Sequence, residues 1–266
     1  MVNGQMQRSV TSARSLSLPE SVWPYRLLTL VVVLSVWEVY ARIEGSPLTF
    51  PAFSAVAVAL GELVQSPELW QATWTTLQSF LLGFPIGVAI GILFGVVIAL
   101  SPVVARLSGF YVRLLLTMPM SSVVPIAIAL LGLGLGSRVA LVVLFVVGVV
   151  TVNTATGLRS ASPQLTEMAR SFYASPTLTF LRVRLPAAIP SIMAGLRLGA
   201  GRGVVGMVVA ELIISPSGLG RLIVRYRAQF HAAEMFGVVV VLLVLGVLIL
   251  RSVRLAENRM LHWQRK

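Results

Sequence analysis

The fold class follows from the segment Leu77–Leu100, which reads LQSFLLGFPIGVAIGILFGVVIAL and contains no charged residue. An α-helix rises about 1.5 Å per residue, so about 20 apolar residues are needed to cross the hydrocarbon core of a bilayer. This segment therefore predicts a transmembrane helix. The run Met235–Leu250 near the end of the sequence is of the same kind, so we expect the chain to cross the membrane more than once.

The composition of the whole sequence agrees with a membrane protein. Of the 266 residues, 57% are hydrophobic and 11% are charged, whereas about 25% of the residues of an ordinary soluble domain are charged. The apolar blocks are continuous, unlike the alternating pattern of a transmembrane β-barrel. We predict an all-α fold, a polytopic bundle of about six transmembrane helices. They are placed at Val22–Ala41, Leu77–Leu100, Leu114–Leu133, Val139–Leu158, Ile189–Ile214 and Met235–Leu250.

Several classes of function lack the residues that they need. The sequence has no cysteine and no aspartate, and its histidines are His231 and His262, so we expect no catalytic residue, no metal site and no cofactor bound by this chain. The net charge of +12 comes from arginines that mostly flank the apolar blocks, whereas a nucleic-acid-binding protein gathers them on a polar face. We therefore expect neither an enzyme nor a nucleic-acid partner.

The basic residues also predict the orientation. With the N-terminus inside, 14 of the 21 lysines and arginines fall in inner segments and 5 in outer segments. Cytoplasmic loops are enriched in these residues, so both termini are expected in the cytoplasm. Residues 1–20 are predicted to be a disordered tail, and residues 21–266 the transmembrane domain. No small-x-small cleavage pattern follows the first apolar block, which is therefore expected to be a retained helix.

Two predicted helices carry glycine at every fourth position. Helices in lipid associate by close packing, which a stripe of small residues allows. The stripe of the second helix is expected to pack within one subunit, and that of the fifth fits either packing or a surface that slides during a conformational change. The residues are Gly83, Gly87, Gly91 and Gly95 in the second helix and Gly195, Gly199 and Gly203 in the fifth.

Pro119 and Pro125 interrupt the third predicted helix. Carbonyl groups that lose their helical hydrogen bonds inside a membrane need other partners or a cavity. This helix is therefore expected to be kinked, and a place along the pathway is one interpretation of it.

The longest predicted inner loop, 160–186, has helix signals of its own. Ser162-Pro163 and Ser175-Pro176 each place a capping serine before a proline suited to the first helical turn, which predicts helices at 163–173 and 176–184. An apolar face on the first helix fits a groove of a partner protein, or it packs on the chain's own membrane helices or the lipid headgroups. That face is formed by Leu165, Met168, Ala169 and Phe172.

The same loop resembles a known family. Its spacing is Glu167-Met168-Ala169, three residues, Tyr173, nine residues, and Val183-Arg184-Leu185-Pro186. This is similar to the signature E-A-A, three residues, G, nine residues, I-x-L-P of ABC importer permeases of the binding-protein-dependent type I family. The segments LPAAIP at 185–190, VVAEL at 208–212 and GLG at 218–220 resemble the nitrate, sulfonate, taurine and bicarbonate branch. The resemblance covers about residues 74–250.

The resemblance implies a set of partners. The chain would act with two cytoplasmic ABC ATPase subunits that bind ATP and Mg, a second permease copy in a homodimer, an extracytoplasmic solute-binding protein and the lipid of a bacterial inner membrane. The sequence contains no G-x-x-x-x-G-K-[ST] loop, so the ATPase is expected to be separate. The residues implied to couple to it are Leu165, Glu167, Met168, Ala169, Phe172, Tyr173, Val183, Leu185 and Pro186.

The sequence departs from the family signature at three positions. Met168, Val183 and Tyr173 stand where the family has alanine, isoleucine and glycine. If the site of Tyr173 needs a left-handed backbone, tyrosine costs about 1 kcal/mol or more relative to glycine. Either the turn differs here, or Tyr173 fills part of the ATPase groove.

Charged residues inside the fifth predicted helix are candidates for the translocation pathway. Arg197, Arg202 and Glu211 lie there, and a buried charge in a membrane is costly unless it is paired or hydrated. Arg202 and Glu211 are about 180° apart on a straight helix, so they do not pair with each other. Each arginine is expected to pair with another helix, a second subunit or water, or to contact an anionic cargo.

The outer segment between the last two helices predicts an amphipathic helix. The arginines of this helix are expected to lie in water at the membrane interface, and the resemblance implies a closing element near a docked binding protein. The apolar positions are Leu219, Leu222, Ile223, Tyr226 and Phe230, and the basic positions are Arg221, Arg225 and Arg227.

We interpret the sequence as the permease subunit of an ATP-driven ABC importer for a small solute. An oxyanion such as nitrate, a sulfonate or taurine fits the branch and the two arginines of the fifth helix, although related systems carry uncharged heterocycles. The alternative is a secondary transporter or channel without an ATPase partner, in which Arg197, Arg202 and Glu211 serve ion coupling.

Overall fold

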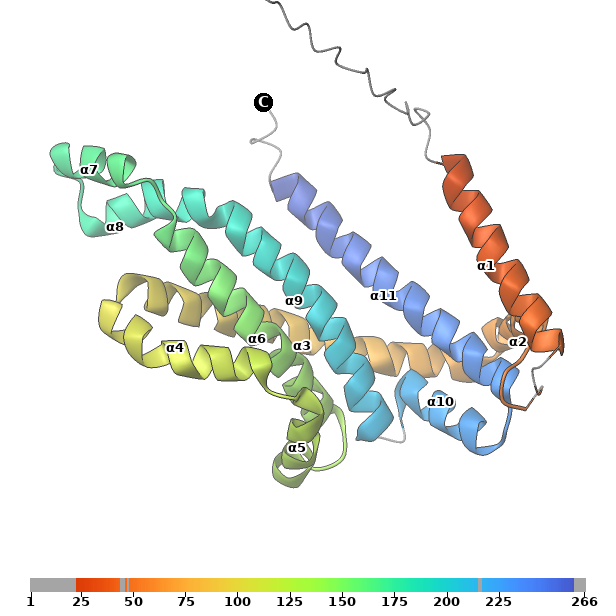
Figure 1. Cartoon of the computed structure of the whole chain (residues 1–266). Coiled ribbons are helices and arrows are strands. Elements are labelled where there is room, and N and C mark those ends of the chain that lie inside the picture. Colours follow the sequence, from red (N-terminus) through yellow and green to blue (C-terminus); the bar gives the residue numbers. More distant parts are fainter. Residues whose placement is uncertain (1–22, 44–45, 47, 215–216, 261–266) are drawn as a thin grey trace, which may run out of the picture.

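The computed structural model describes residues 23–43, 46, 48–214 and 217–260, which form helices joined by turns (Figure 1). The predicted tail at residues 1–20 lies outside this range. Among the described helices, four are long and apolar enough to cross a membrane. They are α3 (Pro67–Leu100), α6 (Leu135–Arg159), α9 (Leu185–Ile213) with the helical turns that precede it from Pro176, and α11 (Ala232–Met260).

Helices α3 and α6 pack side by side in parallel, with the glycine stripe of α3 between them. A Cβ atom added to Gly83 would lie 2.6 Å from the Cβ of Val142, and one added to Gly95 would lie 2.5 Å from the Cβ of Thr154. The residue numbers of the contacting pairs differ by the same amount along both helices, so the two helices run in the same direction. The glycine stripe of α3 therefore packs against α6 of the same chain, which is the packing within one subunit that we expected from the sequence.

Helix α9 completes the core by packing antiparallel to α6. A Cβ added to Gly195 would meet Asn153, and one added to Gly203 would meet Phe80 and Val146. The side chains of Val142, Val146 and Val150 are fully buried in this three-helix core. Helix α11 then packs on α9 in the antiparallel direction, since Arg197 contacts Glu257 and Gly201 faces Leu250.

The predicted third helix, Leu114–Leu133, is wrong as a single helix. The structure has α4 (Pro102–Thr117), a 3-10 turn η1 (Met120–Val123) and α5 (Val124–Leu131). Helix α4 ends where Pro119 disfavours the helical backbone for Met118, which adopts φ −59° and ψ 130°. Pro125 lies in the first turn of α5, where its missing N–H costs nothing.

The α4–α5 segment nevertheless has to cross the membrane. Helix α3 ends and α6 begins on opposite sides, because the two helices run in parallel. The segment that joins them therefore returns across the bilayer, although neither α4 nor α5 is an unbroken spanning helix. This return adds a fifth crossing to those of the four spanning helices, and α1 (Trp23–Ile43) lies where the sequence predicted the first helix.

The ends of the described helices fall on two sides. Figure 1 shows the first turn of α1, the last turn of α11 and the hairpin of α7 (Pro163–Ser171) and α8 (Pro176–Thr179) on one side, and α5 and α10 (Gly218–Ala228) on the other. The sequence did not predict α2 (Phe53–Gln65), because its 13 residues are too few to cross a membrane.

Candidate functional site

The α7–α8 hairpin forms the end of the molecule that the sequence predicted as a coupling loop. Ser175 caps α8 as expected, since its hydroxyl accepts a hydrogen bond of 3.3 Å from the N–H of Leu178. Ser162 does not cap α7, because its hydroxyl is hydrogen-bonded to the side chain of Gln164 instead. The predicted second helix, 176–184, continues through a π-helical turn, η2 (Phe180–Arg184), directly into α9.

The apolar face of α7 is uncovered in this chain. The exposed fractions are 47% for Leu165, 52% for Met168 and 78% for Phe172, and only Ala169 is half-buried. Large apolar side chains gathered on one face of a short helix mark an interaction surface. We name Leu165, Met168 and Phe172 the docking face.

Other residues assigned to the coupling loop lie apart from the docking face. Three of them are half-buried at the junction of η2 and α9, at the base of the hairpin: Val183, Leu185 and Pro186. Glu167 is on the opposite side of α7 from the docking face, lining a polar pocket with Arg159 and Arg170. The sequence grouped Glu167 with the docking face, and the structure separates them.

Tyr173 occupies a left-handed turn, with φ of 54°. Its N–H donates to the carbonyl of Arg170 at 2.9 Å, and the N–H of Ala174 donates to the carbonyl of Ala169 at 3.0 Å, so the residue ends α7 in the manner of a C-terminal glycine cap. The position where the signature has glycine therefore has a left-handed backbone in this chain, with a tyrosine in place of glycine. Tyr173 is 98% exposed, so its side chain is available to a partner protein.

A pair of substitutions tests the turn at Tyr173. Glycine adopts a positive φ freely and valine is the worst fit, because its branched Cβ clashes with the left-handed backbone. We expect Tyr173→Gly to preserve co-purification of the ATPase and Tyr173→Val to lower it several-fold. The measurement is the ratio of ATPase to permease after affinity purification. Equal ratios for the two variants would show that the turn does not determine docking.

Glu211 lies in a buried polar network, not along a cavity. Its carboxylate accepts hydrogen bonds from the hydroxyl of Thr76 at 2.7 Å and the N–H of Gly220 at 3.1 Å, and Arg138 approaches to 3.5 Å. The side chain of Glu211 is fully buried and that of Arg138 is 6% exposed. The assignment of Glu211 to the translocation pathway is therefore corrected, because its carboxylate faces α3 and α6 inside the protomer.

The two arginines of α9 face different surroundings. Arg197 forms an ion pair of 2.9 Å with Glu257 of α11, which is the structural pairing that the sequence left open. Arg202 lies five residues further on, about 140° around the helix. It is exposed, and within the described chain it has no ion-pair partner. The uncovered strip of α9 around Arg202 also bears Leu198 and Val205, which are 55% and 52% exposed.

On the side of the molecule where α5 and α10 lie, α10 is held to α3 by ion pairs. Arg225 makes a two-pronged contact with Glu68 at 2.7 and 2.9 Å, and Arg221 contacts the same carboxylate at 3.0 Å. The hydrogen bonds to Glu68 raise the pKa of the Arg225 guanidinium above its ordinary value. Arg221 and Arg225, which the sequence predicted to lie in water, are partly exposed and are also ion-paired with Glu68.

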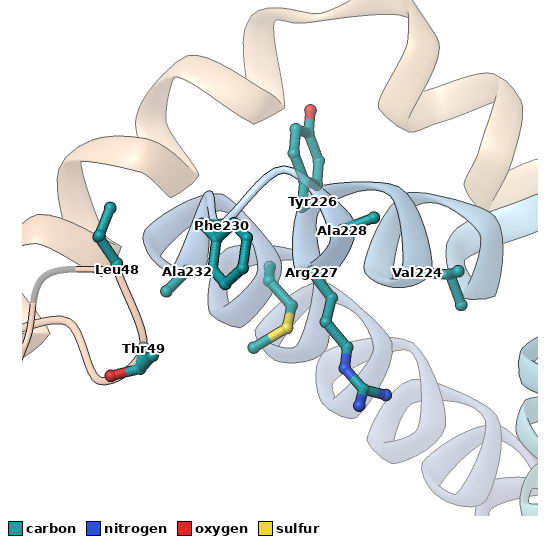
Figure 2. A pocket seen from close by; sticks show the side chains of 9 residues that line it. Leu48, Thr49, Val224, Tyr226, Arg227, Ala228, Phe230 and Ala232 are labelled. Carbon is teal, nitrogen blue, oxygen red and sulfur yellow. The ribbon is translucent and has the colours of Figure 1, made fainter.

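A hollow of about 590 Å³ opens beside α10 and the start of α11 (Figure 2). Tyr226 and Arg227 point to opposite sides of α10, and Phe230 lies just beyond its end (Figure 2). Phe230 is 62% exposed with φ of 58°, so it is not on the predicted apolar face. We call this space the outer hollow, after the side of the membrane that the sequence predicted for this segment.

Sequence reasoning missed Thr76, Arg138 and Glu257, which are the partners of the charged residues that it found. Arg138 is one of the five basic residues that the sequence analysis counted in outer segments. The structure places it in the first turn of α6. The available signal was the absence of any same-face base for Glu211 on its own helix, which required a base from another helix.

Comparisons with known proteins bear on the whole chain. A family model described as the binding-protein-dependent transport system inner membrane component matches residues 87–262. The putative aliphatic sulfonates transport permease protein of Escherichia coli strain K12 is 33% identical, over 88% of this chain and 89% of its own length. The riboflavin transport system permease protein of Chloroflexus aurantiacus is 31% identical, over 95% and 96% of the two chains.

The fold has solved neighbours as well. A chain of the MetNI methionine ABC transporter in an inward-facing conformation superposes with a TM-score of 0.61, covering 73% of this chain and 95% of that chain at 19% sequence identity. At this identity the likeness concerns the fold. It agrees with the arrangement of α3, α6 and α9 as one transmembrane core.

Proposed function

The chain belongs to the family of binding-protein-dependent transport system inner membrane components, and from that premise we propose that it forms the pathway of an importer for a small oxyanion. It is the permease subunit of an ABC importer for small solutes, and ATP hydrolysis belongs to a separate subunit. The alternative of a channel or secondary transporter is set aside on the same ground.

The docking face of α7 is the contact with the ATPase in this proposal. This face is exposed and apolar, and it lies at the tip of the hairpin. The base of the hairpin continues through η2 into α9, so a movement of the ATPase that displaces the hairpin also displaces α9. Two ATPase subunits, binding ATP and Mg, engage two permease copies in a homodimer. A solute-binding protein approaches the opposite side, near α10 and the outer hollow.

The orientation in this proposal has both termini in the cytoplasm. The hairpin of α7 and α8 lies on the same side as the first turn of α1 and the last turn of α11 (Figure 1), so an ATPase at the hairpin puts all three on the cytoplasmic side. The distribution of arginine and lysine along the sequence supports the same choice.

The guanidinium of Arg202, which has no ion-pair partner in the part of the chain that the structure describes, is the observation that supports an anionic cargo. The ion pairs inside the bundle occupy Arg138 and Arg197, whereas Arg202 projects from the uncovered strip of α9 near the middle of that helix. A cation in a site of low dielectric attracts an anion strongly. Among the relatives, the sulfonate permease is named for anions and the riboflavin permease for an uncharged ring compound, and Arg202 favours the first class.

Exchange of the two arginines for glutamine tests this proposal. We expect Arg202→Gln to reduce uptake of a sulfonate at least tenfold while the amount of assembled complex stays normal, because no ion pair is broken. Arg197→Gln is the matched control, which leaves Glu257 unpaired and should lower the amount of complex but not uptake per complex. Uptake is measured with labelled substrate in proteoliposomes that contain the ATPase and binding protein.

Two outcomes contradict an oxyanion cargo. Normal sulfonate uptake by Arg202→Gln shows that the guanidinium is not used by the cargo. Transport of an uncharged heterocycle in preference to any anion by the native complex assigns the chain to the other class of relative. Arg202→Lys should retain much of the uptake, since it keeps the charge.

A further inference from the structure

A basic pocket lies where α7 meets the ends of α3 and α6. Its volume is about 360 Å³, and it is lined by three arginines, Arg159, Arg170 and Arg184, together with Thr166 and Glu167. On α7, Thr166, Glu167 and Arg170 recur at helical spacing on the side opposite the docking face. The basic pocket is therefore separate from the surface proposed to contact the ATPase.

The charge of the basic pocket is not neutralised by the described chain. None of its three arginines has a carboxylate within 4 Å among the described residues, although elsewhere Arg138, Arg197 and Arg225 have one each. Arg159 donates to the carbonyl of Ile98, which fixes its position but does not change its charge. With Glu167 included, the pocket keeps an excess of two positive charges.

An apolar cleft adjoins the basic pocket. It has a volume of about 310 Å³ between α3, α4 and α6, and Phe94, Ile98, Tyr111, Leu115 and Val147 are among the residues that line it. Ile98 lines the cleft and Ala99, the next residue of α3, lines the pocket, so the two spaces lie close together at the end of that helix. Most of the cleft lining is apolar, and Ser108 and Thr151 also belong to it. A mostly apolar cleft beside a cationic pocket matches an amphiphile with an anionic head.

The level of the basic pocket in the membrane identifies that amphiphile. The spanning helices α3 and α6 end at Leu100 and Arg159, so the pocket lies where the hydrocarbon core gives way to the headgroup layer. Arginine binds phosphate through charge-assisted hydrogen bonds, and anionic lipids attract basic groups at this level.

We propose that the basic pocket and the apolar cleft bind one anionic phospholipid. Its phosphate lies between Arg159, Arg170 and Arg184, and an acyl chain lies in the cleft. The lipid contacts α7 on the side opposite the docking face and so stabilises the position of this helix. This proposal depends neither on the cargo nor on the direction of transport, so it stands or falls apart from the role of Arg202.

The test uses the full chain, purified in detergent until free of lipid. Phosphatidylglycerol or phosphatidylcholine with identical acyl chains is added, and bound lipid is counted by native mass spectrometry. We expect roughly tenfold tighter retention of phosphatidylglycerol, which weakens as salt is raised. The double variant Arg159→Gln, Arg184→Gln should lose this preference. The matched double variant Arg106→Gln, Arg113→Gln, in exposed arginines of α4, should keep it.

Two further variants separate the parts of the site. Ser108→Phe fills the cleft, so it should lower retention of both lipids. Arg170→Gln changes an exposed residue of α7 that no fold contact requires, and it should weaken the preference for phosphatidylglycerol even if the double variant fails to fold. Equal retention of the two lipids by the native chain, or an unchanged preference in Arg170→Gln and in the double variant, overturns the proposal.

The source of the phosphate is distinguished in the same assay. If inorganic phosphate protects the chain against thermal unfolding as well as phosphatidylglycerol does, the occupant is a soluble phosphate and the lipid assignment is wrong. If the native chain shows no lipid preference but Arg170→Gln loses its co-purifying ATPase, the arginines pair with the ATPase, and the proposal is likewise overturned.

Discussion

Glu211→Gln is expected to remove most of the folded protein from the membrane. The change keeps the size of the side chain but leaves the guanidinium of Arg138, 6% exposed, without a counter-charge. Breaking a buried ion pair by removing one partner costs about 3–5 kcal/mol. That is a large fraction of the stability of an ordinary domain.

The same substitution also loosens α10. The carboxylate of Glu211 accepts from the N–H of Gly220, and Thr76, which donates to Glu211, accepts from the N–H of Leu219 at 2.9 Å. The first turn of α10 is thus tied to both α3 and α9 through one carboxylate. Weakening this acceptor frees the outer end of the molecule, where we propose that the binding protein docks.

The measurement is the amount of protein in the membrane and its thermal unfolding in detergent. Glu62→Gln is the control, since Glu62 is exposed on α2 and the chemical change is identical. The double variant Arg138→Met, Glu211→Leu should recover part of the lost stability, because it removes both buried charges. A native unfolding temperature for Glu211→Gln would show that the network contributes little.

The glycines near Glu211 follow from this network. Gly218 has φ of 74°, and a Cβ added to Gly220 would lie 2.5 Å from the Cβ of Glu211. Only a backbone without side chains lets the first turn of α10 approach the carboxylate so closely. The network also explains why two sequence motifs occur together. The carboxylate of Glu211 in Ala210-Glu211-Leu212 accepts a hydrogen bond from the backbone of Gly218-Leu219-Gly220.

The sequence predicted most of the helices but few of the side-chain contacts between them. Hydropathy places α3, α6, α9 and α11 because length and apolar content are local properties. The break at Pro119 was visible as a proline, but whether the chain kinks or stops there depends on its neighbours. The pairing of Glu211 with Arg138 requires the register of α6 against α9, which no single segment contains.

The helices of the predicted coupling loop could be placed for a similar reason, whereas the residues that surround them could not. Capping serines and prolines placed α7 and α8, and helical spacing showed the apolar face. The spacing also puts Glu167 on another side of α7, but nothing in the sequence shows that Arg159 and Arg184 come from other helices to meet it there. Sites built by several helices are seen only after the helices are packed.

Gly91→Leu is expected to prevent α3 and α6 from packing. A Cβ at Gly91 would lie 2.7 Å from the Cβ of Val150 and 3.1 Å from the carbonyl oxygen of Val147. These atoms belong to a branched side chain and a helix backbone, and neither can move aside within a rigid helix. Overpacking a core costs about 1–3 kcal/mol for small changes, and a whole leucine at this position exceeds that range.

Gly91→Leu is expected to be harmful because residue 91 faces α6. A leucine on another face of the same helix is therefore the control. Ala89 lies on the exposed side of the same helix, about 160° away, so Ala89→Leu adds a similar volume toward lipid and should be neutral. We expect Gly91→Leu to be degraded or to unfold at a much lower temperature, measured by membrane abundance and by thermal unfolding in detergent. The paired variant Gly91→Ala, Val150→Ala should tolerate the added methyl group, because the facing side chain is shortened. If Gly91→Leu accumulates like Ala89→Leu, the parallel α3–α6 contact is not the core of this fold, and the return crossing inferred for α4 and α5 loses its basis.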